Sequence, residues 1–417
     1  MRSPVTAMSE DRVPQIDFDV YEHSSMAGSD EAWNALRAKC PVSWSARNLG
    51  HWTIAGYEEA VEAFRDWETF SSERTDPAIA SVTGTESRQP LMLPEESDPP
   101  RWRGLRQVLA ELLSPRMSER LQPRVTHWVT HSIDRFIESG RAELADDLAV
   151  RVPCCVTMEW LGWPQDEWVE AASCFHDIIK EPGGSPGYYE AHRKFEWLSE
   201  RVHEEVSARR LHPRDDVLSV IANYEIDGEL LPLDVAESIV VLTIGGGTDT
   251  TTSVTSAAIV HLGRNPEDKE RLRTHPELID SATEEFLRLY SPVRIQARIV
   301  GRDAEFRGCQ LRAGDRVLVS ETSANRDERA FPNADRFIMD RFPNRHVAFG
   351  AGIHRCPGSH LARLQFKTSI NQLMRRLPDF VLDDDGVIEY PNWSFVGGWG
   401  AIPVTFTPGP RILSDGG

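Results

Sequence analysis

The residues best suited to do chemistry lie near the C-terminus, in segment 349–358, which reads Phe-Gly-Ala-Gly-Ile-His-Arg-Cys-Pro-Gly. Three glycines and one proline predict an irregular loop, because glycine adopts backbone angles closed to other residues and proline interrupts regular structure. Such a loop can approach a flat surface closely, with the thiol of Cys356 near its end. The alternative is a buried, inert cysteine in a glycine-rich turn, which is what most free cysteines are.

A second unusual segment lies in the middle of the chain. An apolar pattern predicts one helix over Leu233–Arg264, with Pro232 before it and Asn265-Pro266 after it. This helix is about three times as long as the average helix. Its centre, 245–252, reads Gly-Gly-Gly-Thr-Asp-Thr-Thr-Thr, and each glycine costs about 1 kcal/mol relative to alanine. The glycines indicate either a local opening for a flat cofactor and a small molecule, or close packing between helices.

Together these two segments resemble the signature motifs of the cytochromes P450. The loop matches Phe-Gly-x-Gly-x-His-x-Cys-x-Gly at every fixed position, and 246–251 match [Ala/Gly]-Gly-x-[Asp/Glu]-Thr-[Thr/Ser]. A third motif, Glu-x-x-Arg, is matched by Glu285 and Arg288. The resemblance covers nearly the whole chain, from 98–100 to 403–404. It implies a mainly α fold with smaller β-sheets, of the α+β class, in which the long central helix lies over a haem.

The resemblance implies that the cofactor is haem b and that the Cys356 thiolate is its metal ligand, an axial ligand that favours O–O bond cleavage. The residues implied to contact the cofactor are Trp102, Arg106, Gly246, Arg298, Phe349, Gly350, His354, Cys356 and Gly358. The two haem propionates need cationic or hydrogen-bonding partners, for which Trp102, Arg106, Arg298 and His354 are the candidates. Trp102 departs from the family pattern, because many bacterial members carry histidine there. An indole N–H still donates one hydrogen bond, without a charge.

The acid–alcohol pair of the central helix is implied to deliver protons. In the family, a hydroxyl holds dioxygen and its attendant water, while a nearby carboxylate relays protons from solvent. We therefore expect Thr250 in the first role and Asp249 in the second. The implied activity is a monooxygenase that inserts one oxygen atom into a C–H or C=C bond. Two other activities stay open: a peroxide-driven peroxygenase, a type that generally lacks this pair, and a haem protein that senses a ligand without turnover.

The Glu285 and Arg288 side chains, three residues apart, share one face of a predicted helix. In the family this pair is buried and joined by a downstream arginine, which here should be Arg336. Breaking such a network by removing one partner is costly. We expect these three residues to be structural and to fix the cysteine loop.

The walls of the substrate pocket are expected from segments that match the family. The residues expected to line it are Met92, Leu242, Gly245, Val293, Ile295, Phe395 and Val396. They are mostly apolar and favour a lipophilic substrate, such as a terpenoid, a steroid, a fatty acid or a natural-product intermediate. Arg294 could bind a substrate carboxylate, although solvent or a haem propionate is its expected partner.

The remaining organisation follows from local patterns. His51–Ile54 is predicted as a strand and Tyr57–Arg65 as the helix after it; Cys309–Leu311 and 316–319 are predicted to form a β-hairpin. Two irregular segments, 74–100 and 181–187, would be the B–C and F–G loops of the family, which cap the cavity and open for entry. We expect one domain over 1–417, with a flexible tail over 1–13.

An electron donor is expected to be a separate protein, because no flavin or nicotinamide domain follows the cysteine loop. Arginines in the segments expected around the thiolate predict a basic patch for a small acidic ferredoxin: Arg101, Arg103, Arg345, Arg355 and Arg363. Ordinary surface arginines are the alternative.

Composition excludes several function classes. The 417 residues are 40% hydrophobic and 27% charged, which is typical of a globular protein. A net charge of −19 argues against nucleic acid or anionic lipid as a partner. No apolar run reaches the roughly 18 residues that span a bilayer, and 1–12 lack the apolar core of a signal peptide. Six cysteines without zinc-type spacing fit a reducing cytosol. We expect a cytoplasmic monomer.

Overall fold

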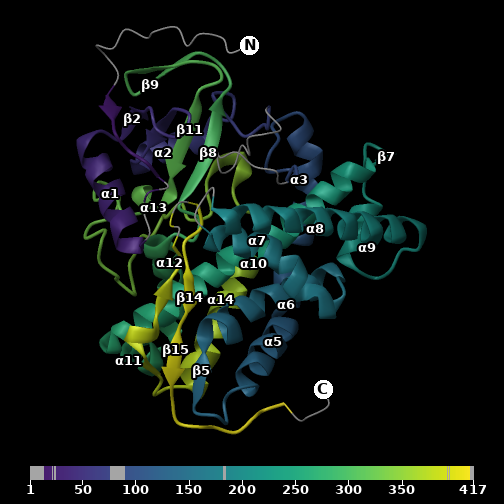
Figure 1. Ribbon diagram of the computed structural model, residues 1–417, viewed down its shortest axis with the longest axis vertical. Helices are drawn as coiled ribbons and strands as arrows, with labels where there is room; N and C mark the ends of the chain where they lie inside the picture. The colour runs from purple at the N-terminus through teal and green to yellow at the C-terminus, as the bar shows by residue number, and fades with distance from the viewer. Residues whose placement is uncertain are drawn as a thin grey trace.

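The computed structural model describes residues 14–20, 22, 25–75, 90–181, 185–391, 393 and 395–413. The tail expected over 1–13 lies outside the described residues, as do 76–89 and 182–184 in the middle of the two expected loops. Figure 1 shows strands β2, β8 and β11 in the upper left of the molecule, with most of the helices below and to the right of them.

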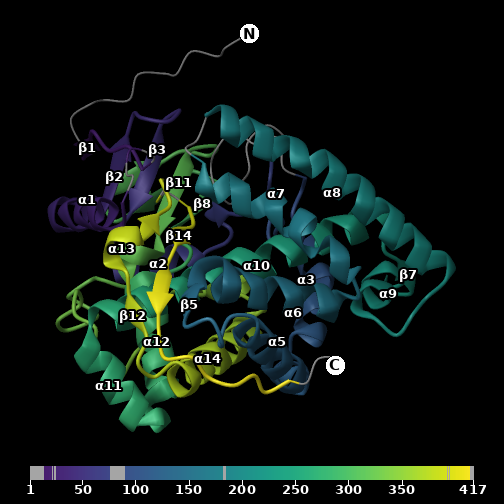
Figure 2. The same cartoon turned by 60° about the horizontal axis from the view of Figure 1, so that its bottom comes forward.

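The helical part is built around one long central helix, α10, which packs against α6, α7, α8, α12 and α14 (Figure 2). The α-helices are α1 Met26–Lys39, α2 Tyr57–Arg65, α3 Arg101–Leu112, α4 Pro115–Arg120, α5 Gln122–Asp134, α6 Arg151–Leu161, α7 Trp168–Lys180, α8 Pro186–Leu211, α9 Val217–Ala222, α10 Leu233–Arg264, α11 Pro266–Thr274, α12 Ile279–Tyr290, α13 Glu321–Ala324 and α14 Ser359–Arg376. A π-helix over Ala145–Val150 precedes α6. The apolar residues that face α10 on these helices form the main core.

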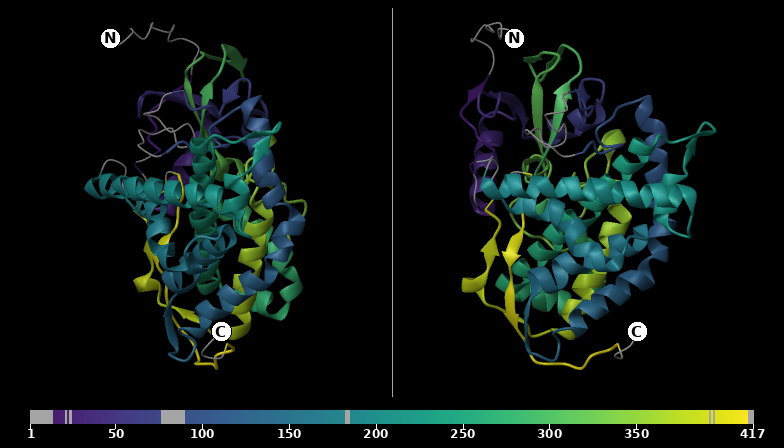
Figure 3. Two further views of the ribbon diagram at one scale, coloured as in Figure 1. Left: turned by 90° about the vertical axis from the view of Figure 1, so that its right-hand side faces the viewer. Right: turned by 45° about the vertical axis from the view of Figure 1, so that its right-hand side comes forward.

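The largest sheet has six strands in the order β1-β2-β3-β11-β8-β4. Its strands are β1 Gln15–Ile16, β2 Val42–Ser45, β3 His51–Ile54, β4 Phe70–Ser71, β8 Ile295–Val300 and β11 Arg316–Ser320. Strands β1 and β2 pair in parallel, as do β3 and β11, and the other neighbours are antiparallel. Strand β8, which contains Gln296 and Arg298, is a member of this sheet. Figure 3 shows the green strands of the sheet above the long teal helices.

Four small sheets complete the fold. They pair β9 Ala304–Phe306 with β10 Cys309–Leu311, β6 Glu225–Ile226 with β7 Glu229–Leu230, β13 Ile388–Glu389 with β14 Trp399–Ala401, and β15 Pro403–Thr405 with both β12 Val381–Leu382 and β5 Arg141–Glu143.

The predicted helices over Tyr57–Arg65 and Leu233–Arg264 and the predicted strand over His51–Ile54 are confirmed. The predicted β-hairpin is wrong in its pairing. Strand β10 pairs with β9 across a tight turn in which Arg307 and Gly308 have φ of 51° and 80°. Strand β11 instead lies between β3 and β8, because all five of its residues are buried and need neighbours on both edges.

The glycines of α10 serve both of the expected purposes. A side chain at Gly245 would lie 2.4 Å from Phe175 of α7, and one at Gly247 would lie 2.6 Å from Thr157 of α6. These two positions therefore allow close helix packing. A side chain at Gly246 would meet nothing within 4 Å. Gly246 thus leaves open space beside the helix.

Candidate active site

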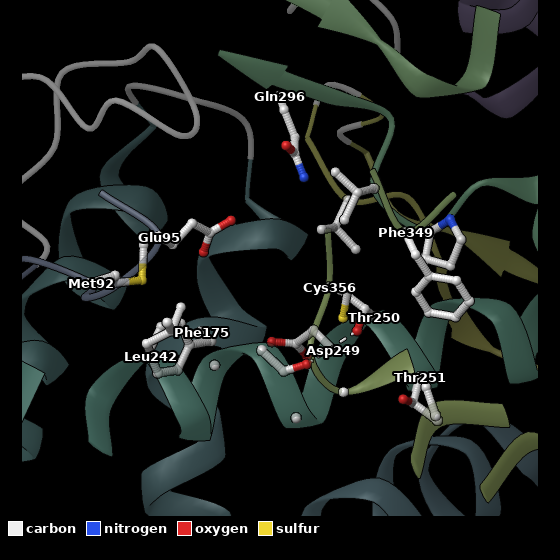
Figure 4. A pocket seen from close by; sticks show the side chains of 18 of the residues that line it. Met92, Glu95, Phe175, Leu242, Asp249, Thr250, Thr251, Gln296, Phe349 and Cys356 are labelled. Carbon is white, nitrogen blue, oxygen red and sulfur yellow. Dashed lines mark hydrogen bonds between the residues drawn. The ribbon is translucent and has the colours of Figure 1, made fainter. Parts of the chain in front are cut away.

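One cavity of about 670 Å³ lies between α10 and the cysteine loop. Gly246, Asp249 and Thr250 line it from α10, and Cys356 and Phe349 line it from the loop. Figure 4 shows Asp249 and Thr250 of α10 and Cys356 of the loop among the residues that line the cavity, while Glu95 and Gln296 project towards it from other segments. Most of the surface inside the cavity is apolar. The described part of the site therefore combines one thiol, one acid–alcohol pair and mostly apolar walls.

The backbone of the cysteine loop fixes the position of the sulfur. Gly350 and Gly352 have φ of 65° and 70°, which side chains rarely tolerate. A side chain at Gly352 would also collide with the backbone oxygen of Phe64 in α2. The loop backbone therefore packs directly against that helix. The backbone N–H of Cys356 donates to the Phe349 carbonyl at 2.9 Å. These contacts turn the Cys356 side chain into the cavity.

The surroundings of Cys356 have opposing effects on the pKa of its thiol. Burial raises the pKa of the Cys356 thiol, while a hydrogen bond from the Gly358 backbone N–H and the charge of Arg106 act in the opposite direction. A metal ion bound to the sulfur would deprotonate it outright. The loop thus already holds a donor that can stabilise a thiolate.

Several buried donors near the cavity lack an anionic partner, and they fit the carboxylates of a haem. The Arg298 guanidinium is buried, and within the described residues it bonds only to the Ala297 carbonyl and the Gln296 side chain. Burial without a direct counter-ion lowers its pKa. In the part of the chain that the structure describes, the buried indole N–H of Trp102 has no hydrogen-bond partner, and Arg106 donates only to the Arg355 carbonyl. Arg298, Trp102 and Arg106 would therefore be suitable partners for the two propionates of a haem whose iron Cys356 would hold.

His354 is also placed for this task, but it already has one partner. Its Nε2 atom lies 3.2 Å from Oδ1 of Asp98, and the ring lines the cavity. Asp98 also accepts a hydrogen bond from Ser71. Of the other residues expected at the cofactor, Gly246, Phe349 and Gly358 line the cavity, whereas Gly350 does not.

The acid of the acid–alcohol pair has a partner that sequence reasoning missed. Nδ1 of His176, in α7, lies 2.8 Å from Oδ1 of Asp249, and both side chains are buried. Among the described residues, Nε2 of His176 has no hydrogen-bond partner. The Thr250 hydroxyl donates to the Gly246 carbonyl at 3.3 Å. The Asp249 carboxylate is thus fixed through one oxygen, and its other oxygen, Oδ2, makes no hydrogen bond within the described residues.

Six of the seven expected pocket residues line the cavity: Met92, Leu242, Gly245, Val293, Phe395 and Val396. Ile295 does not. It is fully buried against Phe18, Val20 and Trp33 on the other face of β8, because successive side chains of a strand point to opposite faces. The next residue, Gln296, lines the cavity instead.

The ion-pair network differs from the expected one in its third member. Glu285 accepts two hydrogen bonds of 2.8 Å from Arg288 and two of about 3 Å from Arg341. Arg336 is exposed, and only its backbone carbonyl takes part, as an acceptor for both arginines. The expected role of Arg336 therefore belongs to Arg341. The chain turns between the two residues, so that the side chain of Arg341 faces inwards.

This network connects to the cysteine loop through Asn325 and Asn344. Arg288 donates to the Asn325 carbonyl, and Oδ1 of Asn325 accepts from the Val347 backbone N–H at 2.7 Å. Asn344 donates to Glu285 at 3.1 Å. The network therefore holds the segment that leads into the loop.

Arg294 and the expected basic patch also need correction. Arg294 is buried, bonds to Asp30 and lies over the Trp393 ring, so it faces neither solvent nor a propionate. Arg363 pairs with Glu284 at 2.6 Å and lies over the Phe349 ring, which makes it part of the loop support. The other arginines of the patch are exposed: Arg101, Arg103, Arg345 and Arg355.

A thiol at the end of a glycine-rich loop, facing an acid–alcohol pair and flanked by propionate-type donors, defines a haem-thiolate protein. The family model "Cytochrome P450" matches residues 274–393. The chain is 30% identical to a steroid C26-monooxygenase of Mycolicibacterium smegmatis, over 93% of this chain and 95% of the relative. It is 32% identical to cytochrome P450-terp of a Pseudomonas species, over 74% of this chain and 75% of the relative. The chain belongs to the cytochrome P450 family.

Solved structures agree. P450BioI, in complex with an acyl carrier protein ligated to hexadec-9Z-enoic acid, aligns with a TM-score of 0.82 at 26% identity, over 91% of this chain and 98% of that chain. The expected α+β cytochrome P450 fold, the monooxygenase class and the haem b cofactor are thereby confirmed. Within the described residues, no helix combines the length and apolar character needed to cross a membrane.

Proposed function

We propose that this monooxygenase inserts one oxygen atom from O₂ into a lipophilic small molecule, with electrons from a separate ferredoxin. The supporting observation is the cavity itself, in which Cys356 faces Asp249 and Thr250 between mostly apolar walls. The steroid and methyl-branched-lipid hydroxylases among the relatives act on lipophilic molecules by their names. A cytoplasmic location and a monomeric state stay predictions.

The haem, when bound, supplies the activation of dioxygen, and the Cys356 thiolate would hold its iron. Arg106, Arg298, Trp102 and His354 would hold the propionates and so set the orientation of the ring. The apolar walls exclude water from the reacting end of the substrate. Gly246 leaves room beside α10 for a small molecule.

Thr250 and Asp249 move protons in this proposal. The Thr250 hydroxyl lies on the cavity side of α10 and can hold a water molecule there. His176 fixes Oδ1 of Asp249, so that Oδ2 can give and take a proton at the cavity. A peroxide-driven enzyme and a ligand sensor need no such pair.

The proposal is tested with purified holoprotein, a ferredoxin, its reductase and NADH, offered steroids, terpenoids and fatty acids. A product carrying one ¹⁸O atom from ¹⁸O₂ is expected from at least one class. Product formation only with hydrogen peroxide would favour the peroxygenase alternative. NADH consumption without any oxidised product, in the presence of tightly bound ligands, would favour the sensor.

Replacing Thr250 by alanine should uncouple NADH consumption from product formation. Substrate still binds, but protons are no longer delivered in order, so product formed per NADH should fall about tenfold or more while peroxide accumulates. The measurement is the ratio of product, peroxide and NADH consumed. Thr252→Ala is the matched control, because Thr252 is buried in the same helix, bonds to the Thr248 carbonyl and does not line the cavity. Unchanged coupling in Thr250→Ala would contradict the assigned role.

The exposed arginines near the loop should steer the ferredoxin. Charge reversal at Arg101 and Arg355 should lower the association rate by about tenfold or more at low salt, because complementary charge mainly raises the encounter rate. Stopped-flow reduction at several salt concentrations measures this effect. Arg141→Glu, an equally exposed arginine in β5, is the control. Equal association rates for all variants would exclude the surface around Arg101 and Arg355 as the docking site of the ferredoxin.

A further inference from the structure

The segment 95–98 carries three acids next to the cavity, and only one of them lacks a partner. Glu96 accepts from the Met92 backbone N–H at 3.0 Å and pairs with Arg74. Asp98 bonds to Ser71 and His354. Glu95 makes no hydrogen bond and no ion pair within the described residues, and its carboxylate projects towards the cavity. An unpaired carboxylate at a mainly apolar wall is costly and requires an explanation.

The charges around Glu95 explain why nothing in the protein satisfies it. The charged and titratable groups around it are Glu96 from its own segment, Arg106 from α3, Arg298 from β8, Glu321 from α13 and Cys356 from the cysteine loop. Burial and the Glu96 charge raise the pKa of Glu95 to about 7, against the opposing effect of the two arginines. Neither arginine makes a direct ion pair with Glu95.

A bound haem would remove even this distant compensation. Its two propionates would be neutralised by the guanidinium groups of Arg106 and Arg298, which leaves Glu95 without a cation. Glu321, another acid that lines the cavity, is fully buried, and burial raises its pKa well above the usual range. Neither of its carboxylate oxygens has a hydrogen-bond partner within the described residues. The third acid, Asp249, is bonded to His176.

No other cation in the described part of the cavity is available to Glu95. Arg316 donates to the Asn48 carbonyl, and Arg363 pairs with Glu284. His354 is bonded to Asp98. Of the acids that line the described part of the cavity, Glu95 and Glu321 therefore lack a hydrogen-bond partner, and of these two only Glu95 is partly accessible. A charge-assisted contact from a ligand cation is the strongest interaction that this arrangement offers.

We propose that the substrate carries a cationic nitrogen on a lipophilic skeleton and that Glu95 binds this nitrogen, an assignment that rests on the proposed monooxygenase function. The apolar walls hold the skeleton by shape. Glu95 fixes the end of the molecule and so selects which carbon reaches the reacting position. It is a specificity-determining residue of the site.

The test compares three ligands that share an eight-carbon chain, by calorimetry on the holoprotein. Octyltrimethylammonium carries a fixed cation that cannot ligate iron, octanol is neutral and octanoate is an anion. At pH 8 the cation is expected to bind at least about tenfold more tightly than the alcohol. Its affinity should rise as the pH is raised from 6 to 9, because the Glu95 carboxyl, whose pKa lies above its usual range, must be ionised to hold the cation.

Glu95→Gln should abolish both the preference for the cation and the pH dependence, whereas Glu95→Asp should retain part of each. Glu267→Gln, which removes an exposed acid at the start of α11, is the matched control and should behave as the wild type. Several outcomes would overturn the proposal: equal or tighter binding of octanol or octanoate, a preference that survives Glu95→Gln, or no binding of any ligand.

These outcomes are separable from a failure of the proposed function. Every variant is first checked for the ferrous–CO band near 450 nm that a thiolate-ligated haem gives. Turnover of neutral lipophilic compounds without a preference for the cation would overturn only the role of Glu95. Absence of any oxygenated product, despite the expected binding pattern, would overturn only the monooxygenase proposal.

Discussion

Replacing Cys356 by alanine is expected to abolish the ferrous–CO band near 450 nm and all oxygenation. Among the described residues, the only other sulfur that lines the cavity is that of Met92, which lies in a different segment. The backbone contacts of the loop do not involve the thiol, since the Cys356 N–H and the Phe349 carbonyl make them. The fold should therefore persist, and the loss should be one of ligation rather than of structure.

The measurement is a CO-difference spectrum of the haem-reconstituted variant, with far-UV circular dichroism to confirm folding. Cys40→Ala is the control, because Cys40 lies at the end of α1 and outside the cavity. It should retain the full band. Retention of the band in Cys356→Ala would refute the ligand assignment and, with it, the orientation of the haem.

The elements around the site were predictable where local chemistry marks their ends. Helix α10 begins after Pro232 and ends before Asn265-Pro266, and the sequence predicts both bounds. The cysteine loop was predictable because its glycines fill positions that side chains cannot occupy. In both segments, the residues that determine the local backbone structure lie close together in the sequence, so the sequence alone predicts that structure.

The predictions of Ile295 and Arg336 were wrong because they depend on which side of the backbone a side chain points to. Ile295 and Gln296 are neighbours in β8, and an assignment one position away selects the wrong face. Arg336 and Arg341 lie in an irregular segment without a period, so spacing could not distinguish them. The alternation of burial along β8 becomes visible only when the sheet partners are known.

Other site residues were missed because their meaning depends on distant parts of the chain. His176 and Asp249 lie 73 residues apart, and the helical pattern of 168–180 shows only that His176 is on a helix. Glu95 sits in an acidic, proline-rich segment that resembles a surface loop. Only the packing of this segment against α3 and β8 places its carboxylate at the cavity.

Replacing Glu285 by glutamine is expected to lower the free energy of unfolding by about 3–5 kcal/mol, because it leaves the buried cations of Arg288 and Arg341 without their anion. The loss should extend to the cofactor, since the same network holds Asn325 and, through it, the backbone before the cysteine loop. Guanidinium unfolding measures the first effect, and the rate of haem transfer to apomyoglobin measures the second.

Two arginine variants make this a test of the corrected network. Arg341→Gln should resemble Glu285→Gln, because it too removes one partner of a buried ion pair. Arg336→Gln should change the free energy of unfolding by less than about 0.5 kcal/mol, since its exposed side chain makes no contact with Glu285. The reverse ranking of the two arginines would show that Arg336 is the third member after all. Equal, small effects of all three variants would show that the loop is held by its own backbone contacts.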